Sequence, residues 1–155
     1  MKNKLLNTGP SVQKYNKVCD WFLFDEENKI KINSGKIDIG QHISSTLALI
    51  CSKNTGVDYN QIEVIKLDTK FSPDEGKTAS SLSVSHSGTA IKSASIELKN
   101  QFLKYVLLKF KTSLDNIEFE NGIARKKESN KSISYWDFSK TEAYNNLVID
   151  EIIEE

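Results

Sequence analysis

The chain has 155 residues, which is long enough for one domain with a substantial core. Lysine and arginine together number 21, as do aspartate and glutamate, so no overall field attracts nucleic acid or an anionic membrane surface. Arg125 is the only arginine. A phosphate site in this chain must therefore rely on backbone N–H groups, hydroxyls or lysine, because bidentate guanidinium recognition is almost unavailable.

The two cysteines, Cys19 and Cys51, stand far apart in the sequence. They form no Cys-x-x-Cys pair, which excludes an iron–sulfur cluster or a zinc site built from this chain's thiols alone. We expect both thiols to be reduced and buried. No apolar run approaches the length that crosses a bilayer, so we also expect a cytoplasmic location, with neither a membrane nor a nucleic acid as partner.

The first part of the chain predicts an arm, a hairpin and a helix. Residues 1–17 are polar and are expected to form a flexible or draped N-terminal arm. Residues 21–24 and 29–33 have the apolar content and alternation of two strands joined by a turn. A helix is predicted over 41–55, because its apolar residues share one face and Gly56 supplies a stop.

The middle of the chain predicts a strand, a long loop and a long helix. Residues 61–67 are expected to form the strand, and 68–87 contain few large apolar residues and many turn formers. The helix is predicted over 88–111, where apolar residues recur at helical spacing. A hairpin turning at Asn121-Gly122 follows, and then a short helix starts near Ser134, with Ser132 or Ser134 as its cap.

The order of these elements predicts an α+β domain in two layers, with two main helices packed on one face of a mostly antiparallel sheet. The apolar and acidic residues 141–155 are expected to form a C-terminal tail whose apolar side chains dock back or meet a second chain. The expected core between the sheet and the helices consists of large apolar residues from four elements: Trp21, Phe24, Ile43, Leu47, Ile91, Leu98 and Phe102.

Two polar loops stand before the two main helices. The first is Gly35–His42, and the second covers residues 72–88. The N-terminus of a helix offers unpaired N–H groups and a partial positive charge, so two such ends supplied with Gly, Ser, Thr and Gln are suited to a phosphorylated cofactor. The alternative interpretation is an exposed glutamine at a helix start and an ordinary solvated serine loop.

An ordered set of motifs in the chain resembles the molybdopterin-binding region of the molybdenum hydroxylases, the family of xanthine dehydrogenase and aldehyde oxidase. The set is most similar to the N-terminal part of the large subunits of nicotinate dehydrogenase and isoquinoline 1-oxidoreductase. The resemblance covers roughly residues 18–140, which we take as the molybdopterin-binding-like domain. It is carried by Trp21, Phe24, Ser34-Gly-Lys-Ile-Asp-Ile-Gly-Gln41, Pro73-Asp-Glu-Gly-Lys-Thr-Ala-Ser80, Ser83, Gly88 and Ser134-Tyr-Trp136.

The resemblance implies molybdenum held by a molybdopterin, in bacteria usually the cytosine dinucleotide form, and a substrate hydroxylated with oxygen from water. The positions that match cofactor-contacting residues are Gly40, Gln41, Ser80, Ser81, Leu82 and Ser83. A glycine permits close backbone approach, a glutamine amide both donates and accepts hydrogen bonds, and serine hydroxyls can donate to pterin or phosphate oxygens.

Other polar residues are weaker candidates. His42 and His86 invite a metal site, yet two histidines without a defined carboxylate are too few ligands, and supporting or surface roles fit them better. Asp74 and Glu75 fit a general acid/base pair less well than turn or lysine-pairing roles. We therefore assign no catalytic residue and no metal ligand to this chain. His42 and Ser80 also depart from the family pattern, which has glycine after the glutamine and glycine or alanine at the serine.

The family loop with the catalytic glutamate has no counterpart here. The leading hypothesis is a partial subunit of a molybdenum hydroxylase, inactive alone. Its expected partners are the remainder of the large subunit, a small [2Fe-2S] subunit and, in the full complex, a small N-heterocycle or aldehyde substrate. The alternative is an interaction module or decayed remnant that keeps the fold without the cofactor.

Overall fold

The computed structural model describes residues 9–38, 40, 42–66, 70, 72–75 and 84–149, with the side chains of 9, 10, 84 and 85 excepted. Helices and strands in this part of the chain are α1 (Gly9–Lys14), α2 (Val18–Trp21), β1 (Phe22–Phe24), β2 (Ile30–Ile32), α3 (Ile43–Thr55), β3 (Ile62–Val64), α4 (Thr89–Phe110), β4 (Ile117–Glu120), β5 (Ile123–Lys126), β6 (Ser132–Ser134), α5 (Tyr135–Ser139) and α6 (Glu142–Asn145).

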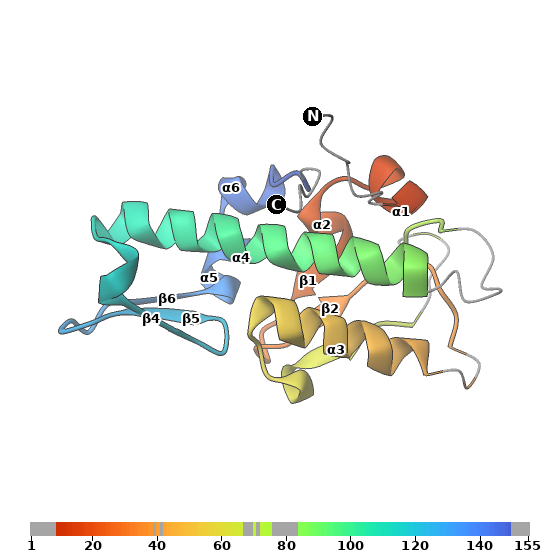
Figure 1. Ribbon diagram of the computed structural model, residues 1–155, viewed down its shortest axis with the longest axis horizontal. Coiled ribbons are helices and arrows are strands. Elements are labelled where there is room, and N and C mark those ends of the chain that lie inside the picture. The colour runs from red at the N-terminus through yellow and green to blue at the C-terminus, as the bar shows by residue number, and fades with distance from the viewer. Residues whose placement is uncertain are drawn as a thin grey trace, which may run out of the picture.

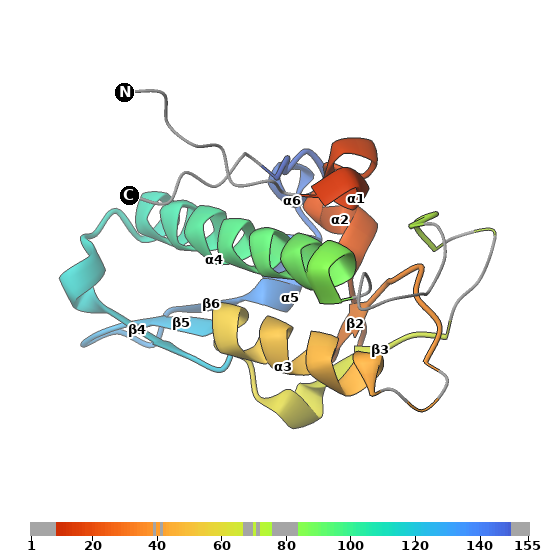
Figure 2. The ribbon, with the colours of Figure 1, turned by 45° about the vertical axis from the view of Figure 1, so that its right-hand side comes forward.

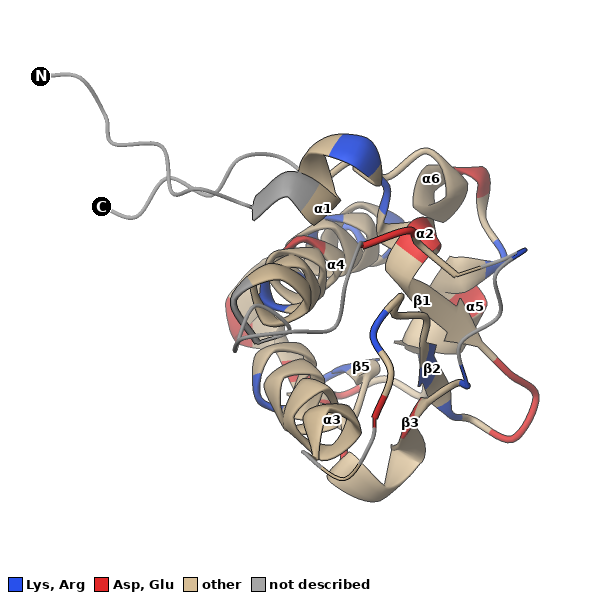
Figure 3. Cartoon of the chain, turned by 90° about the vertical axis from the view of Figure 1, so that its right-hand side faces the viewer, with Lys and Arg blue, Asp and Glu red and all other residues tan. Residues whose placement is uncertain are grey.

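The two main helices cover one side of the strands. Viewed along α4, helices α3 and α4 lie side by side, and β1, β2 and β3 lie opposite them (Figure 3). Lysine and arginine are interspersed with aspartate and glutamate over the elements visible in that view, in keeping with the equal numbers of the two charge types. No helix in the described ranges is long and apolar enough to cross a membrane.

The strands form two three-stranded sheets, whereas the sequence predicts one mostly antiparallel sheet. In the first sheet β1 and β2 are antiparallel, and β2 and β3 are parallel. A parallel pair needs a crossover connection, which α3 supplies between β2 and β3. In the second sheet β4, β5 and β6 are antiparallel throughout.

The two sheets lie at different positions along α4 (Figures 1 and 2). Its 22 residues extend for roughly 33 Å. Figures 1 and 2 show the β4–β6 sheet under the C-terminal half of α4, beyond the end of α3. The chain therefore begins its second sheet at a distance from the first.

Most of the predicted elements are confirmed within a few residues. Helix α3 ends at Gly56, which has a φ of 77° and donates its N–H to the carbonyl of Ser52. Ser134 caps α5, because its hydroxyl accepts the N–H of Asp137 and the Asp137 carboxylate accepts the N–H of Ser134. Four differences remain. Trp21 ends α2 instead of opening a strand, and strand β6 is not predicted. Helix α1 forms within the segment predicted as an arm, where Val12 is buried, and α6 forms within the segment predicted as a tail.

The predicted core is confirmed with one partial exception. Of the seven apolar residues, six are buried, and Phe24 is partly buried against the same cluster. Helix α4 has a stripe of small and large side chains on the buried face, including Ile91, Leu98 and Phe102. The core therefore lies between α4, α3 and the two sheets, and it holds the starts of α3 and α4 in fixed positions.

Candidate functional site

The two polar loops meet at the side chain of Glu75. Its Oε2 atom accepts the hydroxyl of Ser34 at 2.9 Å and the N–H of Gly35 at 2.7 Å. Its Oε1 atom accepts the hydroxyl of Ser87 at 2.7 Å. Ser34, Gly35, Glu75 and Ser87 form a unit that we call the Glu75 clasp. Glu75 as a residue is only 9% exposed, and these three donors replace the water that its carboxylate loses on burial.

The backbones of the two loops also approach closely at the clasp. The ammonium group of Lys36, a residue only 6% exposed, donates to the carbonyl oxygen of Glu75 at 2.8 Å. A Cβ atom added to Gly35 would collide with the carbonyl oxygen of Pro73. Glycine is therefore required at position 35 for contact between the two chain segments.

A second carboxylate organises the start of α3. Asp38 accepts the N–H of Gly40 at 3.0 Å and the N–H of Ser44 at 3.1 Å. These two hydrogen bonds, led by the one from Ser44, hold the pKa of Asp38 below its usual value. The sequence predicts unpaired backbone N–H groups at the start of this helix, yet the N–H groups of Gly40 and Ser44 are paired with the carboxylate of Asp38.

Gly40 is the one predicted contact residue within the described ranges. Its φ of +100° is a conformation that other residues rarely adopt. Among the described residues, no atom outside its own immediate neighbours lies within 4 Å of where a Cβ would stand, so a flat group could approach the backbone closely on this side. Gln41, Ser80, Ser81, Leu82 and Ser83 lie outside the described residues.

The sequence predicts that Gln41 and Ser80–Ser83 lie close together, and this remains a prediction. What the structure shows is that the segments next to them are joined. The residues that join them were not singled out as a group, namely Ser34, Lys36, Glu75 and Ser87. Gly35 and Pro73 mark two turns in the sequence, but no local pattern indicates that turns about 40 positions apart are in contact.

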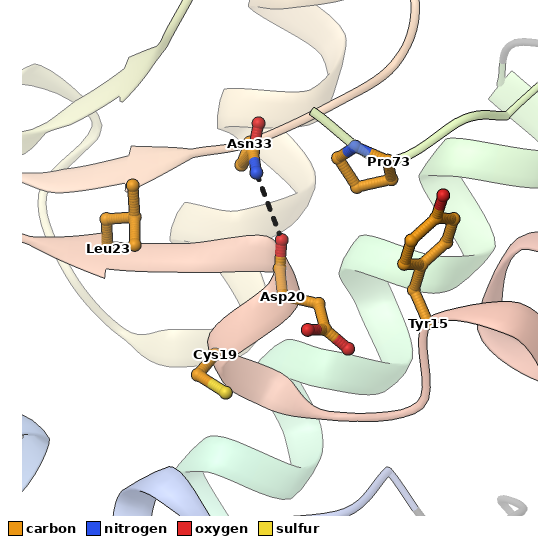
Figure 4. Close-up of a pocket in the computed structure, with 6 residues that line it drawn as sticks. All are labelled: Tyr15, Cys19, Asp20, Leu23, Asn33 and Pro73. Carbon is orange, nitrogen blue, oxygen red and sulfur yellow. Dashed lines mark hydrogen bonds between the residues drawn. The ribbon is translucent and has the colours of Figure 1, made fainter. Parts of the chain in front are cut away.

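A cavity of about 330 Å³ opens beside the clasp and is lined by Tyr15, Cys19, Asp20, Leu23, Asn33 and Pro73 (Figure 4). Asn33 and Pro73 connect it to the two loops, since Asn33 precedes Ser34 in the chain. The amide of Asn33 donates to the carbonyl oxygen of Asp20 at 3.3 Å. The cavity thus combines an apolar wall with a few polar groups, which is the usual make-up of a small-molecule pocket.

A second cavity, of about 450 Å³, lies between α3 and α4 at the start of α4. Gly88 and Thr89 line it together with the apolar side chains of Leu49 and Ile50. Lys53 and Lys92 stand at the same cavity. Both cavities therefore adjoin the second loop, one at Pro73 near its start and one at Gly88 at its end.

The histidines and cysteines do not assemble in the described part of the chain. His42 is exposed at the start of α3, with a φ of 59°, and His86 is half-buried in the π-helical turn Val84–Gly88. Within the described ranges no three His, Cys, Asp or Glu side chains form a group that could hold a metal ion. Cys51 is buried as expected, which raises the pKa of its thiol to about 12, whereas Cys19 is only partly buried.

Comparison with known proteins gives one family and several solved structures with a similar fold. The profile described as the molybdopterin cofactor-binding domain matches residues 7–152. The Cu,Mo-CO dehydrogenase in its carbon monoxide reduced state is 17% identical with a TM-score of 0.61, as is the reconstituted CO dehydrogenase from Oligotropha carboxidovorans. Quinoline 2-oxidoreductase from Pseudomonas putida 86 is 15% identical with a TM-score of 0.57. No curated protein matches the chain significantly.

These structural matches cover most of this chain and a small part of each relative. The alignments cover 84% of this chain for the CO dehydrogenases and 83% for the quinoline enzyme, but only 17% of each of those chains. At such low identities the likeness shows a shared fold. It confirms the α+β class predicted from the sequence.

Proposed function

Because the chain belongs to the molybdopterin cofactor-binding domain family, we propose that it binds one side of a molybdopterin that carries molybdenum. The observation that carries this proposal is the extent of the family match, which spans residues 7–152 and so includes every candidate contact residue. The cytosine dinucleotide form is the version of the cofactor that we propose.

The chemistry of the described residues suits such a cofactor at Gly40. The edge or face of a pterin would meet no hindrance from the described residues on the open side of this glycine. Gln41 follows directly and would offer its amide to the pterin or to an oxygen ligand of the metal. Ser80, Ser81 and Ser83 would donate hydroxyl or backbone hydrogen bonds from the second loop, next to Leu82. When bound, the cofactor supplies the redox centre for hydroxylation with oxygen from water.

The carboxylate of Asp38 influences where the phosphates go. It accepts the N–H groups of Gly40 and Ser44, so a phosphate at the start of α3 would meet a like charge. We therefore place the phosphate donors in the serine segment 80–83.

We propose further that the chain is one part of a molybdenum hydroxylase that oxidises small N-heterocycles or aldehydes. It spans about 17% of the length of the CO dehydrogenase and quinoline oxidoreductase chains to which it is similar. Its sequence has two cysteines and no match to the family loop with the catalytic glutamate. The remainder of the large subunit and a [2Fe-2S] subunit are the partners that would supply a base and an electron acceptor.

One observation favours the alternative of an interaction module without cofactor. The chain's own carboxylates satisfy polar groups of both loops: Glu75 accepts from Gly35 and Ser87, and Asp38 accepts from Gly40 and Ser44 at the start of α3. The loops therefore have internal partners that do not depend on a ligand.

Cofactor analysis separates the two functions. We expect the chain purified from a host that makes molybdopterin to contain molybdenum and pterin in a fixed ratio to protein, and to show no turnover of nicotinate, purines or aldehydes with artificial electron acceptors. Absence of both molybdenum and pterin would favour the interaction module. Turnover by the isolated chain would contradict the partial-subunit proposal.

A variant then tests the site itself. Gln41→Ala should weaken cofactor retention by about 1–3 kcal/mol, the cost of leaving a polar partner unpaired. Gln101→Ala is the matched control. Gln101 lies on α4, and within the described residues its side chain is hydrogen-bonded to Glu97, one turn away on the same helix. Equal molybdenum content in the two variants would count against Gln41.

A further inference from the structure

The Glu75 clasp joins the ends of the two segments that carry the candidate cofactor contacts. Gly40 and Gln41 follow Ser34 and Gly35 along the chain, and Ser80–Ser83 lie between Glu75 and Ser87. Glu75 is hydrogen-bonded to both ends of this arrangement, at Gly35 and at Ser87. The two segments therefore leave from a common point, although about 40 positions separate them.

We propose that Glu75 is a positioning residue of the cofactor site, which sets the distance between the first loop and the start of α4. This inference rests on the proposed function. Glu75 acts through the segments that it joins, because both of its carboxylate oxygens are already engaged by protein donors.

Each of the two carboxylate oxygens of Glu75 binds a different segment of the chain. Oε2 holds the first loop through Ser34 and Gly35, and Oε1 holds the start of α4 through Ser87. The ammonium of Lys36 adds a second tie at the carbonyl of Glu75. Contact of Gly35 with Pro73 prevents a closer approach. Attraction and contact together fix one separation of the loops, and low exposure strengthens each of these hydrogen bonds.

Four substitutions separate the positioning role from general stability. Glu75→Ala removes the carboxylate bonds to the first loop and to Ser87, and it keeps the backbone carbonyl that accepts from Lys36. Glu75→Gln keeps an acceptor for Ser34 and Gly35, and the hydroxyl of Ser87 can turn to accept from the new amide, so this variant should restore part of the function. Ser87→Ala cuts only the tie to α4. Ser95→Ala is the matched control, because Ser95 is as buried as Ser87 but lies within α4, where its hydroxyl donates to the carbonyl of Ile91.

The first measurement is amide hydrogen exchange on the cofactor-free chain. Glu75→Ala should accelerate exchange at Gly35 and at residues 86–88 roughly tenfold or more, the equivalent of one lost buried hydrogen bond, relative to amides of residues 98–106 in α4. An unchanged exchange rate at Gly35 would show that Glu75 does not hold the first loop in place.

The second measurement is the rate at which pterin is lost from the loaded chain. Glu75→Ala and Ser87→Ala should lose pterin roughly tenfold faster than wild type, and the rate for Glu75→Gln should fall between theirs and that of wild type. Ser95→Ala should lose pterin at the wild-type rate, even where its thermal stability is equal to that of Ser87→Ala. The positioning role is wrong if wild type and all variants retain pterin equally. It is also wrong if the rates of pterin loss from Ser87→Ala and Ser95→Ala differ only as their thermal stabilities do. If wild type binds no pterin, the proposed function itself fails, and the positioning role with it.

Discussion

Single carboxylates organise the backbone of the candidate site. Glu75 and Asp38 each accept hydrogen bonds from groups that the sequence leaves without an obvious partner, at Gly35, Gly40 and Ser44. A sequence motif shows that an acidic residue stands near a turn, but the choice of its hydrogen-bond donors depends on how the turn is folded. The sequence consequently favours a turn or lysine-pairing role for Glu75 and assigns no role to Asp38.

The lowered pKa of Asp38 makes part of the stability depend on pH. A carboxyl group whose folded pKa lies below its ordinary value of 3.8 contributes stability that is present above that value and lost as the pH falls through the folded pKa. Asp38→Asn should therefore be less stable than wild type at neutral pH. The difference should shrink below about pH 4 and vanish below the folded pKa. Because Asp38 is exposed, the effect should be small.

Urea denaturation midpoints from about pH 7 to about pH 2.5 check this prediction for Asp38. Glu118→Gln serves as the control, since Glu118 is an exposed carboxylate on β4. A stability difference between wild type and Asp38→Asn that stays constant over the whole pH range would show that the carboxylate does not act through its charge.

At the scale of elements, α4 connects the candidate site to the core. Its N-terminal end follows Ser87 of the clasp, and its buried stripe continues to Phe102 and Val106 among the aromatic residues of the second sheet and α5. Phe102 lies 4.5 Å from Tyr135, centroid to centroid, and 5.8 Å from Phe138. Packing along this one helix therefore determines where the second loop ends.

Two leucines on α4 test this dependence on burial. Leu98 is fully buried, and Leu98→Ala should lower the free energy of unfolding by about 2–5 kcal/mol through lost burial and a residual cavity. Leu108 on the same helix is 79% exposed, and Leu108→Ala should change the free energy of unfolding by about 0.5 kcal/mol or less. Chemical denaturation of both variants measures the difference. Equal losses would mean that the stripe has been assigned to the wrong face.

At the scale of the whole molecule, segments from both ends of the sequence close the fold together. The N–H of Val18 donates to the carbonyl of Leu147, and the N–H of Ile149 donates to the carbonyl of Asn16. The hydroxyl of Tyr144 donates to the carbonyl of Phe22 at 2.6 Å. Of the two outcomes expected for the apolar tail, docking back holds for Leu147 and Ile149, which are buried; Ile152 and Ile153 lie outside the described residues.

Truncating these two buried side chains tests the closure. Leu147→Ala and Ile149→Ala should each lower the free energy of unfolding by about 2–5 kcal/mol, because each leaves a cavity. Val148 stands between them and is 40% exposed, so Val148→Ala is the matched control and should cost much less. Thermal or urea denaturation checks all three variants. A loss at Val148 as large as at its neighbours would indicate that this face meets another surface.

Local chemistry was sufficient to predict most elements. Helix α3 and its stop at Gly56, the turn at Asn121-Gly122 and the Ser134 cap of α5 all follow from residues within a few positions of one another. The buried faces of α3 and α4 follow from apolar spacing in the same way. The family resemblance likewise depends on short motifs in a fixed order, and the family match confirms it at the level of the molybdopterin cofactor-binding domain.

Contacts between distant segments were decided only by the tertiary structure. The parallel pairing of β2 with β3, the division into two sheets and the Glu75 clasp each join residues that lie far apart in the chain. No local preference specifies such pairs, because many partners of the same chemical type are available to a serine, a backbone amide or a carboxylate. Packing of α3 and α4 against the strands selects one set of partners, and that selection brings the two candidate loops to a single point.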